Sequence, residues 1–109
     1  MLSRLVVAIA TENFPSGWFT TKEILNHAEW VDRKKAAPIT TALKRQAKRG
    51  YFKSKKDGYY WSFAITEAGL NAGNWAVNHA VGIDEDVEKY ILWKVKQKEL
   101  NELEVKYRD

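Results

Sequence analysis

Cysteine is absent from the sequence, and histidine occurs only twice. The absence of cysteine excludes disulfides, thiolate metal sites and cysteine nucleophiles together. The two histidines, His27 and His79, are far apart in the chain, so the sequence favours no metal site. Neither histidine belongs to a pattern that pairs a nucleophile with a base. We therefore expect a protein that uses no cofactor, binds no metal and is not an enzyme.

A long apolar run is also missing, because no stretch approaches the roughly 18 apolar residues that a membrane-spanning helix requires. The opening residues 1–10 combine a basic residue with a short apolar run, as a secretory signal does. That run is about half the usual length of such a signal, and Leu2, Leu5 and Ile9 recur at helical spacing. The spacing favours an ordinary first helix of a soluble, cytoplasmic protein.

The hydrophobic residues of the sequence suffice for one core. Of the 109 residues, 45% are hydrophobic and 29% are charged, which is typical of a folded domain rather than a disordered chain. A second independent core would leave each part too small to bury enough apolar surface. We expect one domain with an appendage.

The net charge of +4 is unevenly distributed along the chain. From Arg33 to Lys56 there are ten basic residues and no Asp or Glu, whereas eight acidic and six basic residues follow Asn71. A basic middle and a mildly acidic tail predict a polyanionic partner that is bound by the middle segment.

The beginning of the chain predicts two helices. The first spans Ser3 to Glu12, and residues 18–19 form a short extended segment after it. Thr20 and Glu23 fit a capping box, which starts a second helix at Thr21. Its inward side carries Ile24, Leu25 and Ala28. Residues 29–37 either extend this helix or form a long turn.

A third helix is predicted from Pro38 to Arg49. Proline suits the first turn of a helix, and Gly50 suits the left-handed position just past its end. At about 100° per residue, the inner face carries Ile39, Ala42, Leu43, Gln46 and Ala47. The outer face carries Thr41, Lys44 and Lys48, with Thr40 and Arg45 at its borders. The outer face is therefore basic and bears hydroxyl groups.

A β-hairpin follows, with strands at residues 51–56 and 59–65. Asp57 and Gly58 are the two-residue loop that type I′ hairpins prefer. This loop would place Lys56 opposite Tyr59 and Phe52 opposite Phe63. One face of the hairpin then carries Phe52, Trp61, Phe63 and Ile65, and the other carries Tyr51, Lys53, Lys55, Tyr60 and Ser62.

The tail predicts a partly helical connector over residues 70–82 and a last helix that begins at Asp84. Acidic residues in its first turn complement the helix dipole, and Glu85 with Lys89 is a favourable i,i+4 pair. This helix carries more apolar residues than a helix free in solvent should, so it needs a packing partner. We expect four tryptophans in the core: Trp18, Trp30, Trp61 and Trp75.

Three segments resemble the winged helix-turn-helix family. Residues 19–24 resemble its short strand and the start of its second helix. Residues 43–52 resemble the end of its recognition helix and the beginning of the first wing strand. Residues 65–70 resemble the sequence that commonly follows the wing. Gln46 departs from the pattern, because such domains usually place a buried Leu there. The resemblance implies an α+β, mostly helical fold: residues 1–70 as a DNA-binding domain of three helices and a hairpin wing, and residues 71–109 as connector and C-terminal helix.

The resemblance also implies an interface with double-stranded DNA. The third helix would enter the major groove, and the lysines before it and in the wing would contact phosphates. The residues expected at the DNA are Lys34, Lys35, Thr40, Thr41, Lys44, Arg45, Lys48, Lys53, Lys55, Lys56 and Tyr60. Among them, Arg45 is the strongest candidate for reading sequence, because its guanidinium can donate two parallel bonds to a guanine edge.

The predicted function is transcription regulation by a homodimer. Relatives of the PadR and MarR type use a terminal helix to dimerise, as the segment after Asp84 could. Small size without an effector domain fits a viral or plasmid regulator, and DNA binding implies association with the nucleoid. Two alternatives remain: a winged helix that binds an acidic protein in a replication or transcription assembly, and a binder of RNA or single strands.

Overall fold

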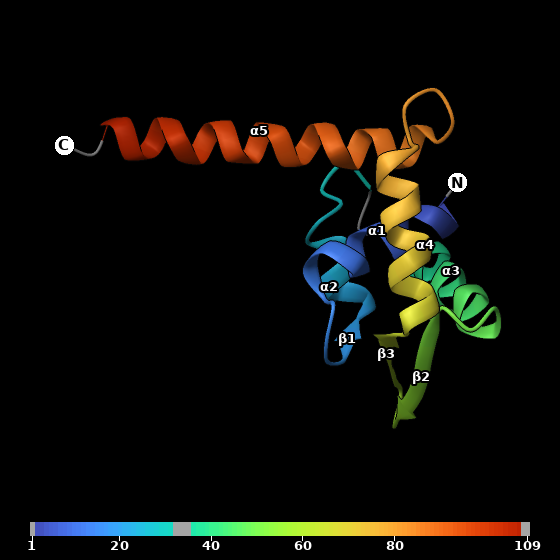
Figure 1. Cartoon of the computed structure of the whole chain (residues 1–109). Coiled ribbons are helices and arrows are strands. Elements are labelled where there is room, and N and C mark those ends of the chain that lie inside the picture. The colour runs from blue at the N-terminus through green and yellow to red at the C-terminus, as the bar shows by residue number, and fades with distance from the viewer. Residues whose placement is uncertain (1, 32–35, 108–109) are drawn as a thin grey trace.

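Five helices and three strands make up the part of the chain that the structure, a computed structural model, describes: residues 2–31 and 36–107 (Figure 1). In chain order the elements are α1 (Leu2–Asn13), β1 (Phe19–Thr20), α2 (Thr21–Leu25), α3 (Ala36–Lys48), β2 (Phe52–Asp57), β3 (Tyr60–Ile65), α4 (Glu67–Asn78) and α5 (Glu85–Tyr107). The strands form one antiparallel sheet in the order β1-β3-β2. Three helices, a short strand and a hairpin in this order are the arrangement of a winged helix, so the predicted fold class is confirmed.

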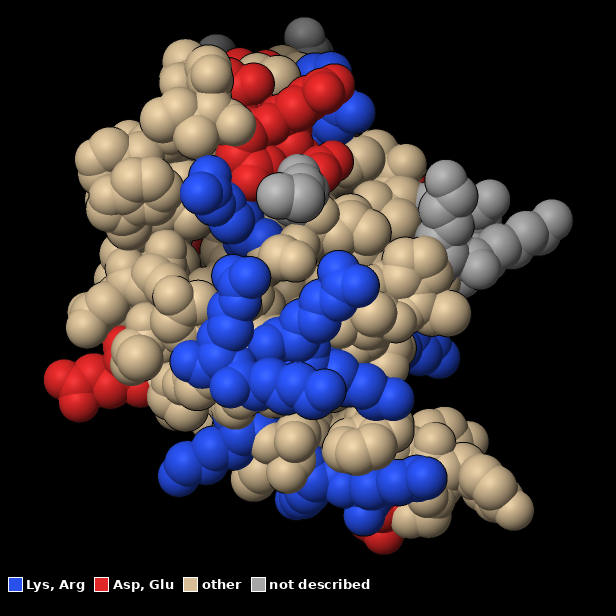
Figure 2. Space-filling model, turned by 90° about the vertical axis from the view of Figure 1, so that its right-hand side faces the viewer, with Lys and Arg blue, Asp and Glu red and all other residues tan. Residues whose placement is uncertain are grey.

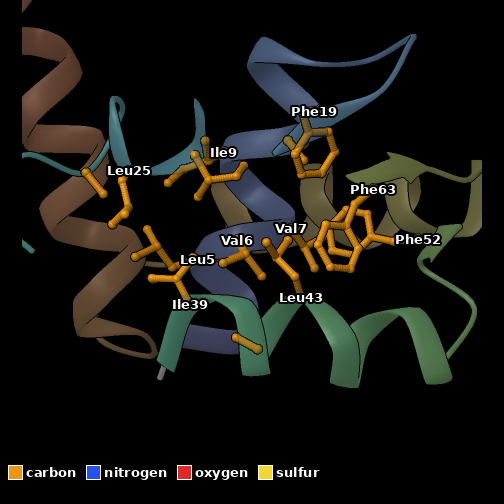
Figure 3. Packing of buried hydrophobic residues seen from close by; sticks show 14 of the residues in the cluster. Leu5, Val6, Val7, Ile9, Phe19, Leu25, Ile39, Leu43, Phe52 and Phe63 are labelled. Atoms are coloured by element: carbon orange, nitrogen blue, oxygen red, sulfur yellow. The ribbon is translucent and has the colours of Figure 1, made fainter. Parts of the chain in front are cut away.

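Helix α1 is the centre of the core. Seven consecutive residues from Leu5 to Thr11 are buried, which requires neighbours on every side of the helix. Figure 3 shows Leu5 and Val6 beside Ile39 and Leu43 of α3, with the rings of the sheet gathered at one end. Helix α4 covers α1 so closely that a Cβ atom on Gly73 would lie 1.8 Å from Thr11 Oγ1.

The predicted capping box at Thr20 is confirmed. Thr20 Oγ1 accepts from the Glu23 amide at 3.4 Å, and the Glu23 carboxylate accepts from the Thr20 amide at 3.2 Å. Helix α2 is short, however, and ends at Leu25. Ala28 is buried as expected, but it lies in the turn after the helix. The alternative of an extended second helix is therefore wrong for residues 29–31.

Helix α3 begins two residues before Pro38, and its faces are divided as predicted. Its buried residues are Ile39, Ala42, Leu43 and Gln46. Gln46, only 2% exposed, donates from Nε2 to the Ser3 carbonyl at 2.9 Å, so a polar group joins α3 to the start of α1 where such domains usually place a leucine. Gly50 has a φ of +87°, which is the predicted left-handed position after the helix.

The hairpin has the predicted faces but not the predicted loop. Asp57 pairs with Tyr60, so the loop is Gly58–Tyr59, and Phe52 lies opposite Ile65 rather than Phe63. A type I′ turn at Asp57–Gly58 would need a positive φ at Asp57, whereas the observed turn places its positive φ, +64°, on Gly58 at the first loop position. Because the register differs by two residues from the prediction, every side chain keeps its face.

Helix α4 replaces the partly helical connector that the sequence predicts. Thr66 caps it by accepting from the Gly69 amide at 3.1 Å, and Thr66 Oγ1 also donates to the Gly50 carbonyl at 2.6 Å. A Cβ atom on Gly69 would lie 2.2 Å from the Tyr51 carbonyl oxygen. The start of α4 is therefore fixed against the base of the hairpin.

Helix α5 packs on the core only near its beginning. Asp84 caps it by accepting from the amides of Asp86 and Val87 at 3.1 and 3.2 Å. Val87 and Tyr90 are buried, while farther along the helix extends past the rest of the molecule (Figure 1). The predicted pair of Glu85 and Lys89 forms at 3.4 Å. None of the described helices is both long and apolar enough to span a membrane.

Two of the four tryptophans expected in the core are instead largely on the surface. Trp18 is 45% and Trp75 48% exposed, whereas Trp30 and Trp61 pack against the core. Both exposed indoles carry a cation: Lys55 Nζ lies 4.3 Å from the centre of the Trp18 ring, and the Arg4 guanidinium carbon 5.6 Å from that of Trp75. Contact with a hydrated cation keeps an indole at the surface, which a count of apolar residues does not predict.

Candidate nucleic-acid interface

The outer face of α3 is open to solvent. Thr41, Lys44, Arg45 and Lys48 are all exposed. Helix α5 packs mainly against α1, so it does not cover this face. Thr41 and Arg45 border a groove of about 480 Å³ beside Leu2 and Ser3 at the start of α1. Their side chains are therefore accessible to a large partner.

Thr40 differs from its neighbours on α3. It is half-buried, and its hydroxyl donates to the Ala36 carbonyl at 3.1 Å and lies 2.8 Å from the Thr21 hydroxyl. These bonds hold α2 against the first turn of α3. Thr40 therefore positions α2 relative to α3, and it also lies at the border of the outer face.

The aromatic ring of Trp61 joins α3 to the hairpin. Lys44 Nζ lies 4.7 Å and Lys56 Nζ 5.8 Å from the centre of this ring. A cation over an exposed indole is stabilised by roughly 0.5–1 kcal/mol. Two ammonium groups from separate elements are therefore held close to one ring, although their charges repel.

The other wing lysines occupy the opposite face of the hairpin. Lys53 pairs with Ala64 and Lys55 with Ser62, whereas Lys56 pairs with Trp61 on the core side. All three lysines are exposed, and Lys55 lies over Trp18. The wing therefore carries cations on both faces, and only Lys56 shares a side with Lys44 of α3.

Figure 2 shows where the charges lie on one face of the molecule. Lys and Arg side chains gather over its middle and lower parts, where α3 and the hairpin lie, and the largest group of Asp and Glu lies at the upper end, toward α5. The ion pairs of Lys94 with Glu12 and of Lys89 with Glu85 belong to α1 and α5. Within the described part of the acid-free run, the basic residues from Lys44 to Lys56 are thus exposed at the surface.

The hairpin tip carries two tyrosines, and the sequence analysis selected only one of them. Tyr60 is 77% and Tyr59 96% exposed. Tyr59 was not selected because the predicted loop, Asp57–Gly58, placed this residue in a strand rather than at the turn. Lys34 and Lys35 lie outside the residues that the structure describes.

Trp18, Trp61 and Arg4 were also missed as members or supports of the cationic surface. The signal for Trp61 was available in the alternation of aromatic and basic residues along the hairpin. Trp18 lies before β1, and its contact with Lys55 joins distant segments. For Arg4 there was no local signal, since its contact with Trp75 joins positions far apart in sequence. No group of three or more potential metal ligands of the His, Cys, Asp or Glu type occurs among the described residues.

The fold and this surface define a winged helix with an appended C-terminal helix. A solved structure with this fold is that of BpsR from Bordetella bronchiseptica, with a TM-score of 0.54 and 15% sequence identity over 89% of this chain and 73% of that chain. That work describes how 6-hydroxynicotinic acid regulates DNA binding by BpsR. No protein-family model matches the sequence, and no curated protein matches it. At this identity the likeness establishes the fold.

Proposed function

We propose that this protein is a transcription regulator that binds double-stranded DNA. The observation that carries the proposal is the exposed basic face of α3, joined to the wing where Lys44 and Lys56 meet over Trp61. A rigid helix that presents cations beside a cationic ribbon suits a duplex, because a helix fits the major groove and lysines neutralise the flanking phosphates. The DNA binding described for BpsR, which shares the fold, supports the same class of partner.

The exposed side chains divide into two roles in this proposal. Arg45 reads a guanine edge with two parallel hydrogen bonds, and Thr41 contacts a neighbouring base. Phosphates are contacted by the lysines of α3 and the wing: Lys44, Lys48, Lys53, Lys55 and Lys56. The same role is proposed for Lys34 and Lys35. Thr40 supports these contacts by holding α2 against α3, and Tyr60 contributes from the wing tip.

We further propose that α5 joins two copies of the chain. Leu92, Val95, Leu100 and Leu103 are all largely exposed. At about 100° per residue, Leu92 and Leu103 project from roughly the opposite side of α5 to the buried Tyr90. A second copy of the helix would cover this apolar face. Residues 1–70 then supply the DNA-binding surface and residues 71–109 the dimer contacts, while α4 also packs on α1.

Titration of duplex binding against salt concentration tests the proposed partner. We expect Arg45→Ala to reduce the preference for the selected sequence over random DNA by about 1–3 kcal/mol. Lys55→Ala and Lys56→Ala should weaken binding to all sequences alike and lower the salt slope by about one unit each. Lys98→Ala, which removes an exposed cation from α5, is the matched control and should leave the slope unchanged.

Selection of bound sequences from a random duplex pool supplies the specific site and tests the dimer. A palindromic site supports two symmetric copies on one duplex. The absence of any retention of random duplex at low salt would refute duplex binding and favour a protein partner. Equal losses on specific and random DNA after Arg45→Ala would reject sequence reading by that residue.

A further inference from the structure

A groove of about 660 Å³ separates the hairpin tip from the first turns of α2 and α3. It is lined by Thr20, Thr21, Lys22, Leu25, Ala36, Thr40, Tyr59, Tyr60 and Trp61. This volume lies within the range of small-ligand pockets, roughly 300–1,000 Å³. The phosphate contacts proposed above do not use the interior of this groove.

Three successive aromatic residues line the groove on the side of the wing. Tyr59 and Tyr60 are 96% and 77% exposed, whereas Trp61 packs against Phe63 with 6.4 Å between ring centres. Planar rings at the edge of a cationic groove suit a planar ligand, because a nucleobase stacks on an aromatic face regardless of its sequence. The wing side of the groove therefore has the chemistry of a stacking platform.

Hydrogen bonds on the opposite side leave an acceptor available. Because the Thr40 hydroxyl donates to the Ala36 carbonyl, Thr21 must be the donor in its 2.8 Å contact with Thr40. The remaining capacity of the Thr21 hydroxyl is then to accept. The Watson–Crick edge of a nucleobase carries N–H groups that can donate to such an oxygen.

The charges around the groove suit a nucleotide rather than a neutral ring. None of the described residues that line it is acidic, and Lys22 is one of them. Lys44 and Lys56 stand over Trp61 at its edge. The nearby acids are Glu23, whose carboxylate accepts from Thr20, and Asp57, which pairs with Tyr60 on the wing. A phosphate beside a base in the groove would therefore meet mainly cations.

We propose that this groove binds one unpaired nucleotide of a DNA whose duplex part lies on α3. The inference rests on the proposed function, since the duplex brings the nucleotide to the groove. Extracting a base from an intact helix costs unstacking and unpairing energy. A base that is already unpaired avoids this cost, so DNA with a one-nucleotide bulge binds more tightly than the fully paired duplex.

Three DNAs of the same sequence test the proposal: the paired duplex, the duplex with one unpaired adenine, and the duplex with an abasic nucleotide at that position. The abasic DNA keeps the charge and flexibility of the bulge but lacks the base. We expect the adenine bulge to bind roughly fivefold or more tightly than the abasic bulge, as stacking on aromatic side chains implies. 2-Aminopurine at the unpaired position should lose fluorescence when it stacks in the groove.

Two variants assign the effect to the groove. Tyr59→Ala should abolish the difference between the adenine and abasic bulges and leave binding of the paired duplex within about twofold, because its ring, 96% exposed, does not support the fold and has no part in the proposed duplex contacts. Thr21→Val should reduce the difference by removing the acceptor. Trp75→Ala, which removes a half-exposed ring on α4, is the control and should preserve it. Thermal melting of each variant checks that the fold is intact.

The outcomes separate this inference from the proposed function. Equal binding of both bulges by a protein that retains the paired duplex would overturn the groove proposal alone. A difference that survives Tyr59→Ala would also overturn it. Binding of the adenine bulge without any binding of the paired duplex would refute duplex recognition and support the groove, whereas retention of none of the three DNAs would refute both.

Discussion

The two ends of the molecule differ in how their surface residues relate to the fold. At the end formed by α3 and the hairpin, the exposed residues are lysines, arginines and aromatic rings, and most of them make few contacts with the core. At the end where α4 and α5 pack on α1, small residues and buried rings hold helices together, and α5 exposes four large apolar residues among its charged ones: Leu92, Val95, Leu100 and Leu103. The first end can therefore change its chemistry without unfolding, while the second determines whether the domain folds.

The largest effect on stability should come from the packed end. Gly73→Val would place a side chain into Thr11, where even a Cβ atom would lie 1.8 Å from Oγ1. We expect a loss of about 3 kcal/mol in the free energy of unfolding, measured by urea denaturation. Asn74→Ala changes an exposed residue of the same helix and should stay within about 0.5 kcal/mol. Equal stabilities of the two variants would show that α4 does not lie tightly on α1.

The second largest effect should be on the association of two copies through α5. Leu100→Asp would place a charge in the proposed contact between two copies and lower the dimer association constant by roughly a hundredfold, because an unpaired buried charge costs several kcal/mol. Asn101→Asp adds the same charge on the neighbouring exposed position and serves as the control. Sedimentation equilibrium of the free protein measures both. A dimer that tolerates Leu100→Asp would place the contact elsewhere.

A smaller effect should follow from Trp61→Leu at the cationic end. The variant keeps every charge but removes the ring over which Lys44 and Lys56 lie. The ring holds both lysines in place for the duplex, so loss of two contacts worth roughly 0.5–1 kcal/mol each should weaken duplex binding by about fivefold to thirtyfold. The salt slope should not change, which distinguishes this variant from Lys56→Ala. A reduced slope would mean that the lysines reach phosphate only from their place over the ring.

The smallest effect concerns pH. His27 lies edge-on to Phe14 and Trp93, and burial lowers its pKa below the ordinary 6.5. The unfolded chain therefore takes up this proton at a higher pH than the folded chain, so stability is full above about pH 6.5 and falls as the pH drops toward the folded pKa. His27→Phe should flatten the dependence of the melting temperature on pH in this window. An unchanged slope would remove His27 as its source.

Features with local causes could be predicted from the sequence. The capping box at Thr20, the division of α3 into a buried and a basic face, and the left-handed Gly50 each depend on residues within one or two turns. The start of α4 had a local signal as well, because the Thr66 hydroxyl caps the Gly69 amide. That signal was overlooked beside the glycines and asparagines that follow.

The features that could not be predicted arise from distant contacts. The hairpin register depends on which loop residue takes the positive φ and on the pairing of β3 with β1, where Phe19 lies opposite Phe63. The exposure of Trp18 depends on a lysine from another strand. For the candidate site, the basic helix face was foreseen, but the placement of Lys44 and Lys56 over one indole and the groove below Tyr60 required the assembled fold.

The junction at Thr66 determines how the wing can move. Its hydroxyl bonds to Gly50, its amide donates to the Tyr51 carbonyl at 3.0 Å, and Gly69 lets α4 sit directly on that carbonyl. Both strands are thus anchored at their root, whereas at the turn a Cβ atom on Gly58 would meet none of the described atoms within 4 Å. A slight tilt at the root of such a ribbon becomes a large displacement of its tip. In the proposed complex, the wing could therefore follow the local width of a DNA groove while α3 keeps its position on the duplex.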